Sequence, residues 1–238
     1  MGRTTLKEKI HDELLARIIK NKFSMQEFLK EGVLAKEFGV SKAPVREALI
    51  ELCNEGVIRN IPRSGYQIIQ LTERDIREAT QFRLILEIEG LKLAADNINE
   101  DNLEELRIMT ESTDYINKGK IVSLEEWWDN NEKFHLKINS IANNSLLTDS
   151  LKRTIHLLWR AVTQLFWKSD PKSYLNYNSS SHVPIYQALR DGNMAQAEAY
   201  LRSDILSILD SFSRQYSFAR ENTTSSYKSL ELPERDLE

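Results

Sequence analysis

The sequence predicts a mainly α-helical protein in which an N-terminal unit of three helices and a β-hairpin precedes an all-α antiparallel helical bundle. Residues 57–70 hold two β-branched runs separated by turn residues, which is typical of a hairpin. Hydrophobic residues recur at helical spacing before this segment and again beyond Thr72. We therefore place the N-terminal unit at residues 1–71, the helical unit at 72–220 and a polar tail, expected to be flexible, at 221–238.

Each element of the N-terminal unit has its own signal. Gly39 can end a helix in the left-handed conformation, and Ser41 is placed to cap the next helix through its hydroxyl. Pro44 is harmless in a first helical turn, where amides have no acceptor within the helix. The expected helices cover residues 6–19, 26–38 and 42–55, and the expected strands cover 57–61 and 66–70.

The helical unit shows helical periodicity interrupted by segments that contain Asn, Gly, Pro or Ser. The expected helices lie near residues 73–97, 100–118, 122–142, 145–168, 173–191 and 194–218.

Charge is distributed unevenly along the chain. The net charge of −4 divides into +3 over residues 1–71 and −7 over residues 72–238. This asymmetry is typical of a DNA-contacting module joined to an acidic effector or assembly module. The one cysteine, Cys53, excludes an internal disulfide and a cysteine-based zinc site. With no signal-peptide pattern and no window of about 18 apolar residues, we expect a cytoplasmic protein without a membrane partner.

The order helix, turn, helix and hairpin is that of a winged helix-turn-helix, with the helix from residue 42 as its DNA-reading element. Lys42 and Arg46 are four residues apart and project side by side from its N-terminal half, together with Ala43. Arg46 can present its planar fork to guanine, and Lys42 can reach a base edge or a phosphate.

Three further positions are expected to contact the DNA backbone. Ser41 is placed for a phosphate, while Arg63 and Gly65 at the hairpin are placed to follow the backbone or the minor groove. A solvated surface helix is the alternative interpretation of any isolated Lys-x-x-x-Arg pattern. The complete arrangement of elements favours binding to double-stranded DNA.

A resemblance to a known family rests on the segments F-G-V-S-K-A-P-V-R-E-A-L-I-E-L-C-N-E-G-V-I and R-S-G-Y. They resemble the GntR family of bacterial transcription regulators, and the helical part is similar to the FadR-type subgroup with an FCD effector domain. The resemblance implies a homodimeric, ligand-responsive regulator, most often a repressor, on a palindromic operator. Arg46 matches the base-reading arginine of that family, whereas Lys42 and Gly32 each stand where an arginine is common.

The same resemblance implies a divalent metal site. The segments N-N-E-K-F-H and S-H-V-P-I-Y-Q-A-L-R-D-G resemble FCD motifs that hold a metal, which places ligands at Asn131, His135, His182 and Asp204. Asn131 replaces a usual aspartate, and Asp204 replaces a usual histidine. Two imidazoles and a carboxylate suit zinc, nickel, manganese or iron without choosing among them. A hydrogen-bonded polar pocket without metal, or a direct organic-ligand site, remains the alternative.

Arg83 and Glu87 are also four residues apart on an apolar helix. They form an intrahelical ion pair at a surface or interface, or else, as the resemblance implies, they lie near an effector cavity where Arg83 binds a carboxylate. A small organic acid, sugar acid or amino-acid-like metabolite is the effector that we expect. The aromatic residues of this unit either line that cavity or form the core: Trp127, Trp128, Trp159, Phe166 and Trp167.

Two other classes of protein compete with this reading. A metal-dependent enzyme would use His135, His182 and Asp204, but the sequence shows no positioned nucleophile and no phosphate-binding glycine loop, so we expect no enzymatic activity. An architectural helical protein would use the winged unit for dimerisation and would not discriminate among DNA sequences.

Overall fold

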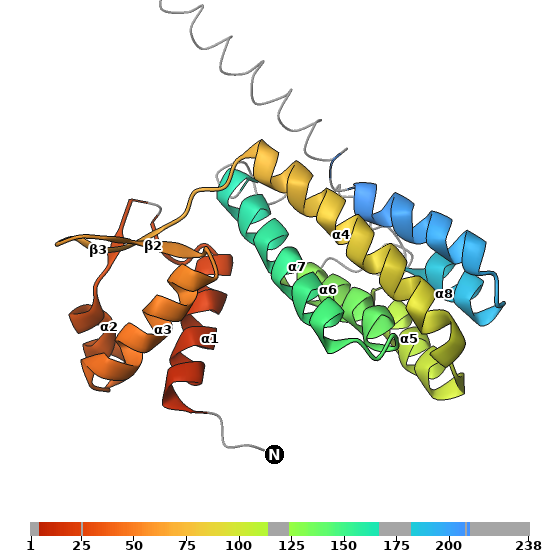
Figure 1. Ribbon diagram of the computed structural model, residues 1–238, viewed down its shortest axis with the longest axis horizontal. Helices are drawn as coiled ribbons and strands as arrows, with labels where there is room; N and C mark the ends of the chain where they lie inside the picture. The colour runs from red at the N-terminus through yellow and green to blue at the C-terminus, as the bar shows by residue number, and fades with distance from the viewer. Residues whose placement is uncertain (1–4, 25, 114–123, 167–181, 208, 210–238) are drawn as a thin grey trace, which may run out of the picture.

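The computed structural model describes residues 5–24, 26–113, 124–166, 182–207 and 209, and it shows a small N-terminal unit beside a longer bundle of helices (Figure 1). The N-terminal unit contains α1 (Leu6–Ile19), β1 (Phe28–Leu29), α2 (Glu31–Phe38), α3 (Lys42–Asn54), β2 (Ile58–Ile61) and β3 (Gly65–Ile68). The bundle contains α4 (Glu73–Ala94), the 3-10 helix η1 (Ala95–Asn97), α5 (Glu100–Thr113), α6 (Leu124–Ser140), α7 (Ser145–Phe166), α8 (Val183–Arg190) and a last helix over residues 194–207. The predicted fold class is confirmed.

One apolar core holds the N-terminal unit together. On α3 the fully buried side chains recur at helical spacing, so the opposite face of the helix stays exposed. At the start of α1 the Thr5 side chain and Glu8 form a capping box that satisfies two backbone amides. The buried core residues are Ile10, Leu14, Ile18, Leu29, Leu34, Ala35, Val45, Ala48, Leu49, Leu52, Val57, Ile58, Tyr66 and Ile68.

The predicted start of the second helix at residue 26 is wrong. Phe28 and Leu29 form β1, which pairs antiparallel with β3, and α2 begins at Glu31. The sheet therefore has three strands in the order β1-β3-β2. Local periodicity could not reveal β1, because its partner strand lies far along the chain. Gly65 permits the pairing, since a Cβ there would lie 2.6 Å from the Leu29 carbonyl oxygen.

The turn between α2 and α3 follows the prediction in its backbone but not in its cap. Gly39 ends α2 in the left-handed conformation at φ 66°, as expected. Ser41 has the extended backbone of an N-cap residue, but within the described residues its hydroxyl accepts no capping hydrogen bond. The predicted capping role of Ser41 is therefore wrong, and the hydroxyl is left available to another acceptor or donor.

The bundle has two apolar cores. One lies next to the N-terminal unit and includes Ile19 and Leu71 together with Trp128 and Trp159, whose rings stack with centroids 5.8 Å apart. The other surrounds Phe134 and joins α4, α5, α6, α8 and the last helix. Trp128 and Trp159 are thus core residues, and Trp127 packs against the same cluster. Trp167 and the side chain of Phe166 lie outside the described residues.

The helices predicted for the bundle are present wherever the structure describes the chain, with ends shifted by a few residues. Several predicted ends fall outside the described residues, as does the predicted tail: the affected stretches are 114–118, 122–123, 167–168, 173–181, 210–218 and 221–238. Among the described helices, none combines the length and apolar character needed to cross a membrane.

Helix α7 joins the two units through its C-terminal half. Its side chains bind backbone groups at the end of α1, after α3 and in the segment that leads into α4. The hydrogen bonds run from Thr163 Oγ1 to the Ile19 carbonyl (2.9 Å), from Gln164 Nε2 to the Ile69 carbonyl (3.1 Å), from the Leu71 amide to Gln164 Oε1 (2.9 Å) and from Arg160 Nη2 to the Gly56 carbonyl (3.4 Å). Burial lowers the pKa of Arg160 to about 10.

Candidate functional site

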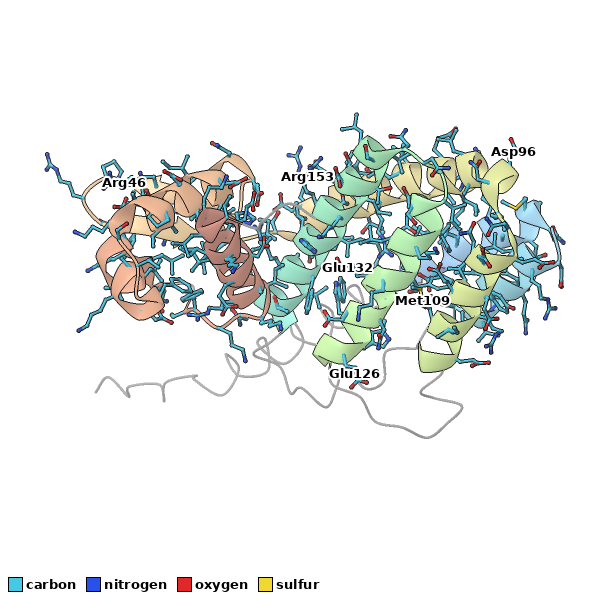
Figure 2. The ribbon with its side chains drawn as sticks, turned by 90° about the horizontal axis from the view of Figure 1, so that it is seen from below. Arg46, Asp96, Met109, Glu126, Glu132 and Arg153 are labelled. Carbon is cyan, nitrogen blue, oxygen red and sulfur yellow. The ribbon has the colours of Figure 1, made fainter. Side chains whose placement is uncertain are left out.

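The N-terminal half of α3 presents an exposed polar edge. Ser41, Lys42, Ala43 and Arg46 are all exposed, because the buried face of the helix carries the core residues described above. Arg46 lies on the side of the N-terminal unit that faces away from the bundle (Figure 2). The edge is therefore open to a large partner such as a DNA duplex.

The hairpin places Arg63 in the turn between β2 and β3. Arg63 is exposed and has a positive φ of 66°, which is unusual for a residue with a side chain. Gly65 has φ 118° and lies against the Leu29 carbonyl, so its small size already has a structural reason. Of these two predicted contacts, Arg63 has the side chain and the exposure to bind a phosphate.

Arg46 does not project freely into solvent. Its Nε lies 3.0 Å from Oε1 of Glu31 and its Nη2 lies 2.8 Å from Oε2, which makes a two-pronged ion pair between α3 and α2. Hydrogen bonding by Arg46 holds the pKa of Glu31 below its usual range. Sequence reasoning missed Glu31, because no local spacing relates it to Arg46.

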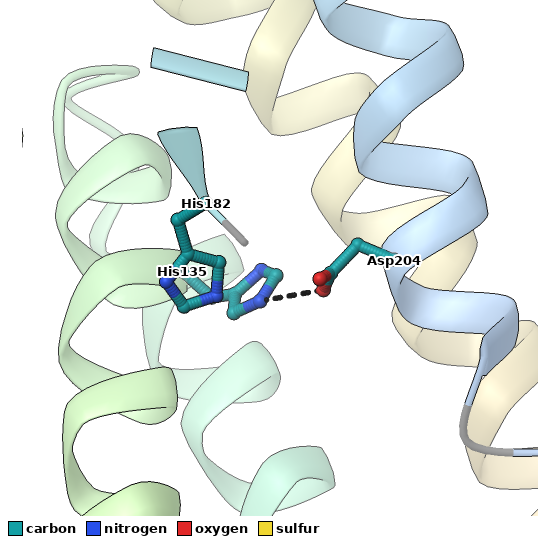
Figure 3. Close-up of side chains that lie close together, drawn as sticks. All are labelled: His135, His182 and Asp204. Carbon is teal, nitrogen blue, oxygen red and sulfur yellow. Dashed lines mark ion pairs between the residues drawn. The ribbon is translucent and has the colours of Figure 1, made fainter. Parts of the chain in front are cut away.

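The bundle encloses a second candidate site. One ligand atom from each of His135, His182 and Asp204 lies within 4.8 Å of the others, and all three residues are buried (Figure 3). His135 comes from α6, His182 immediately precedes α8 and Asp204 comes from the last helix. His135 Nε2 is 3.0 Å from Asp204 Oδ2, at ion-pair distance but without hydrogen-bond geometry. Asn131 joins the group, with Nδ2 3.3 Å from Nε2 of His182.

Arg83 and Glu87 form the layer behind His135. Glu87 receives hydrogen bonds at 2.5 Å from Arg83 Nε through Oε1 and from His135 Nδ1 through Oε2. Arg83 is 3% exposed and Glu87 is 1% exposed, so the alternative of a surface ion pair is wrong. The two residues belong to the same buried chain of polar groups as the predicted metal ligands.

The electrostatics of this site follow from burial and from two carboxylates. Burial penalises a charged His135, but the Glu87 and Asp204 carboxylates outweigh it and raise the pKa of that imidazole. Burial likewise opposes ionisation of Glu87, but the charges of Arg83 and His135 keep the pKa of that carboxyl below its usual range. For His182, burial dominates and lowers its pKa to about 3. His182 is therefore neutral and offers a lone pair.

These donors fit a divalent cation. Nδ1 of His182 is buried and has no hydrogen-bond partner among the described residues, which is a costly state for an imidazole nitrogen. Two imidazoles and the Asp204 carboxylate are a usual donor set for zinc or a similar ion. The hydrogen bond from His135 Nδ1 to Glu87 is of the kind that orients a metal-binding histidine.

The fold is that of a winged helix-turn-helix unit followed by a helical domain, and comparisons with known proteins agree. Residues 6–68 match the family described as bacterial regulatory proteins, gntR family, and residues 78–207 match the FCD domain. The chain belongs to the GntR family of bacterial regulatory proteins, in the group that carries an FCD domain, and it is a DNA-binding transcriptional regulator.

Individual relatives are regulators rather than enzymes. The chain is 28% identical over 209 residues to a probable D-xylose utilization operon transcriptional repressor of Paenarthrobacter nicotinovorans, covering 88% of this chain and 89% of the relative. It is 30% identical over 155 residues to the HTH-type transcriptional regulator YdhC of Bacillus subtilis, covering 63% of this chain and 66% of the relative.

Solved structures share the fold. McbR/YncC of E. coli superposes with a TM-score of 0.72 at 21% identity, covering 90% of this chain and all of that one. A GntR-type regulator from Rhodococcus sp. RHA1 gives 0.65 at 20% identity, covering 86% of this chain and 97% of that one.

Proposed function

We propose that this regulator is a ligand-responsive repressor that binds a palindromic operator as a homodimer in the cytoplasm. The observation that carries the proposal is the exposed N-terminal edge of α3, which carries Lys42 and Arg46. In helix-turn-helix proteins the N-terminal half of the second helix of the motif, here α3, enters the major groove. Arg46 then reads a guanine, and Lys42 binds a base edge or a phosphate.

The remaining contacts position the reading unit, residues 1–71, on the duplex. Ser41 has a hydroxyl that makes no cap and can donate to a phosphate, and Ala43 is small enough to let α3 approach the bases closely. Arg63 and Gly65 follow the backbone from the hairpin. Such contacts set the register of the protein on DNA without specifying sequence.

The effector and dimerisation domain corresponds to residues 72–220. On α4, Phe82, Ile85 and Leu93 are 48%, 65% and 45% exposed and lie along one face of the helix. An exposed apolar stripe of this kind supports burial against a second copy of the chain. Two copies related by a two-fold axis would read two half-sites of a palindrome.

The effector site in the proposal is the buried group around His135. Asn131, His135, His182 and Asp204 would hold a divalent metal, which would supply a positive charge that attracts an anionic metabolite. Arg83 and Glu87 lie directly behind it, and Nη2 of Arg83 has no hydrogen-bond partner among the described residues. Such a site suits a small organic acid, because a carboxylate satisfies both a metal and a guanidinium.

Helix α6, which carries Asn131 and His135, is linked to the reading unit through α7. On α6, Trp128 lies one turn before Asn131, and its ring stacks on Trp159 of α7. Thr163 and Gln164 farther along α7 bind the backbone of the N-terminal unit. An effector that binds one arrangement of α6 and α7 more tightly than another would thus favour one position of the reading unit relative to the helical domain.

The test of this function is the substitution Arg46→Ala in the full-length protein. Operators are first selected from a pool of randomised duplexes. The variant is expected to bind the selected operator about tenfold to a hundredfold more weakly and to lose preference for one guanine, as the loss of a bidentate contact predicts. Arg77→Ala, an exposed arginine on α4, is the matched control.

Binding is measured by titration at fixed salt, with a scrambled duplex alongside. Equal affinity of the wild-type protein for all sequences would reject operator recognition and favour an architectural protein. An unchanged base preference in Arg46→Ala would remove Arg46 from the reading surface.

A further inference from the structure

The contact between Glu31 and Arg46 gives Glu31 a place in the reading surface. Arg46 Nε lies 3.0 Å from Oε1 and 3.1 Å from Oε2 of Glu31, and Nη2 lies 2.8 Å from Oε2. The Arg46 side chain is 58% exposed, whereas that of Glu31 is 21% exposed. The carboxylate therefore lies inward of the guanidinium, between the arginine and the body of the domain.

Several contacts hold Glu31 in this position. It is the first residue of α2, where the amide groups of a helix start favour a negative charge. The Tyr66 hydroxyl, on the central strand of the sheet, donates to Oε1 at 3.3 Å. Lys42 adds a second positive charge that lowers the pKa of Glu31. Glu31 is thus fixed by groups from α2, α3 and β3.

The shape of the guanidinium decides what Arg46 can still do. Glu31 occupies the edge formed by Nε and Nη2. The outer edge still offers one hydrogen from Nη2 and one from Nη1, because a guanidinium carries five N–H donors in a planar fork. Two parallel donors match O6 and N7 of guanine. The ion pair therefore aims the base-reading edge of Arg46 outward.

The charge of Glu31 also favours base contacts of Arg46 over phosphate contacts. A carboxylate beside Arg46 offsets its attraction to phosphates and repels the DNA backbone, while the planar fork is unaffected. Lys42 remains available for a phosphate, and its Cε lies 3.5 Å from the point where a Cβ on Gly32 would be. The missing side chain at Gly32 leaves that space to Lys42.

We propose that Glu31 is a positioning residue that sets base specificity, by clamping one edge of Arg46 and presenting the other to guanine. This inference rests on the proposed operator-reading function. It assigns to α2 a part in sequence discrimination although α2 itself need not touch a base.

The test is Glu31→Ala in the full-length protein, with a duplex selected by the wild-type protein from a randomised pool. Affinity for the selected duplex is expected to fall about tenfold, the scale of one bidentate base contact. Affinity for a scrambled duplex should rise, and its dependence on salt should steepen by about one released counterion. The ratio of the two affinities is the decisive quantity.

Two matched variants separate positioning from charge and from folding. Glu47→Ala removes one negative charge from an exposed position on α3 next to Arg46, and it should leave the ratio of affinities unchanged. Glu31→Gln keeps the shape and one acceptor oxygen, so it should fall between wild type and Glu31→Ala. It also serves as the test variant if Glu31→Ala does not fold.

A double-mutant cycle with Arg46→Ala completes the design. If Glu31 acts through Arg46, adding Glu31→Ala to Arg46→Ala should not reduce discrimination any further. The inference is overturned if Glu31→Ala raises operator affinity, if it weakens both duplexes equally, or if Glu47→Ala has the same effect. Failure of the wild-type protein to select any sequence would instead overturn operator recognition itself.

Discussion

His135 illustrates how single residues are prepared for ligand binding in this bundle. Its Nδ1 donates to Glu87, Glu87 is held in turn by Arg83, and its Nε2 is directed at Asp204. The ring therefore has a fixed orientation before any ligand arrives. In metal sites, such outer contacts commonly change metal affinity by about tenfold to a hundredfold.

A prediction at the residue scale concerns metal retention. The double substitution His135→Ala/His182→Ala should abolish zinc binding, and Glu87→Gln should weaken it about tenfold or more, because the His135 ring loses its charged partner. Affinities are measured by competition with a chromogenic chelator. Glu89→Gln, on the exposed face of the same helix, is the control. Equal zinc affinity in wild type and the double variant would end the metal proposal.

At the scale of elements, the crossing of α4 and α6 depends on one glycine. A Cβ at Gly90 would lie 2.3 Å from Nδ2 and 2.8 Å from Cγ of Asn139, whose side chain is buried and donates to the Leu86 carbonyl at 3.3 Å. Gly90 therefore allows α6 to approach α4 closely, and α6 carries His135. The position of that histidine relative to Glu87 depends on the same approach.

We therefore expect Gly90→Ala to destabilise the protein. Overpacking at a buried contact costs about 1–3 kcal/mol, and displacement of Asn139 would also break its hydrogen bond. The free energy of unfolding is measured by urea titration. Gly32→Ala is the control, since its new Cβ would meet Lys42 Cε at 3.5 Å, an ordinary contact. A loss no greater than in the control would show that α4 and α6 adjust freely.

At the scale of the whole molecule, the two units are joined by α7 as well as by the chain itself. Gln164 accepts a hydrogen bond from the Leu71 amide at 2.9 Å and donates to the Ile69 carbonyl at 3.1 Å. Gln164 therefore holds the segment between β3 and α4 through one backbone amide and one backbone carbonyl. Ile19 and Leu71 also belong to the same apolar core as Trp128 and Trp159.

Gln164→Ala should loosen this junction while leaving all three apolar cores intact. Loss of a hydrogen bond worth about 1–1.5 kcal/mol predicts roughly tenfold faster hydrogen exchange at the Leu71 amide. Exchange is followed by mass spectrometry or NMR. Gln81→Ala, at an exposed position on α4, should leave that rate unchanged. Unaltered exchange in Gln164→Ala would mean that other contacts alone hold the segment.

The sequence by itself determined most elements of this protein and the outward face of α3. Periodicity located the helices, Gly39 located the turn, and the spacing of Lys42 and Arg46 placed them on one exposed edge. These features depend on interactions among residues close together in the chain, so local patterns report them. The resemblance to a family then predicted that His135, His182 and Asp204 share one site. In the structure, one ligand atom from each lies within 4.8 Å of the others.

Only the tertiary structure decided the features that join distant segments. β1 exists because Phe28 and Leu29 meet β3, and Arg46 is clamped because α2 brings Glu31 beside it. Arg83 and Glu87 are buried because α6 and α7 pack against α4, whereas their spacing fits a surface ion pair equally well. Hydrogen bonds and burial across the fold depend on which elements pack together. The packing that forms is the one that minimises the free energy of the whole chain, so local patterns do not report it.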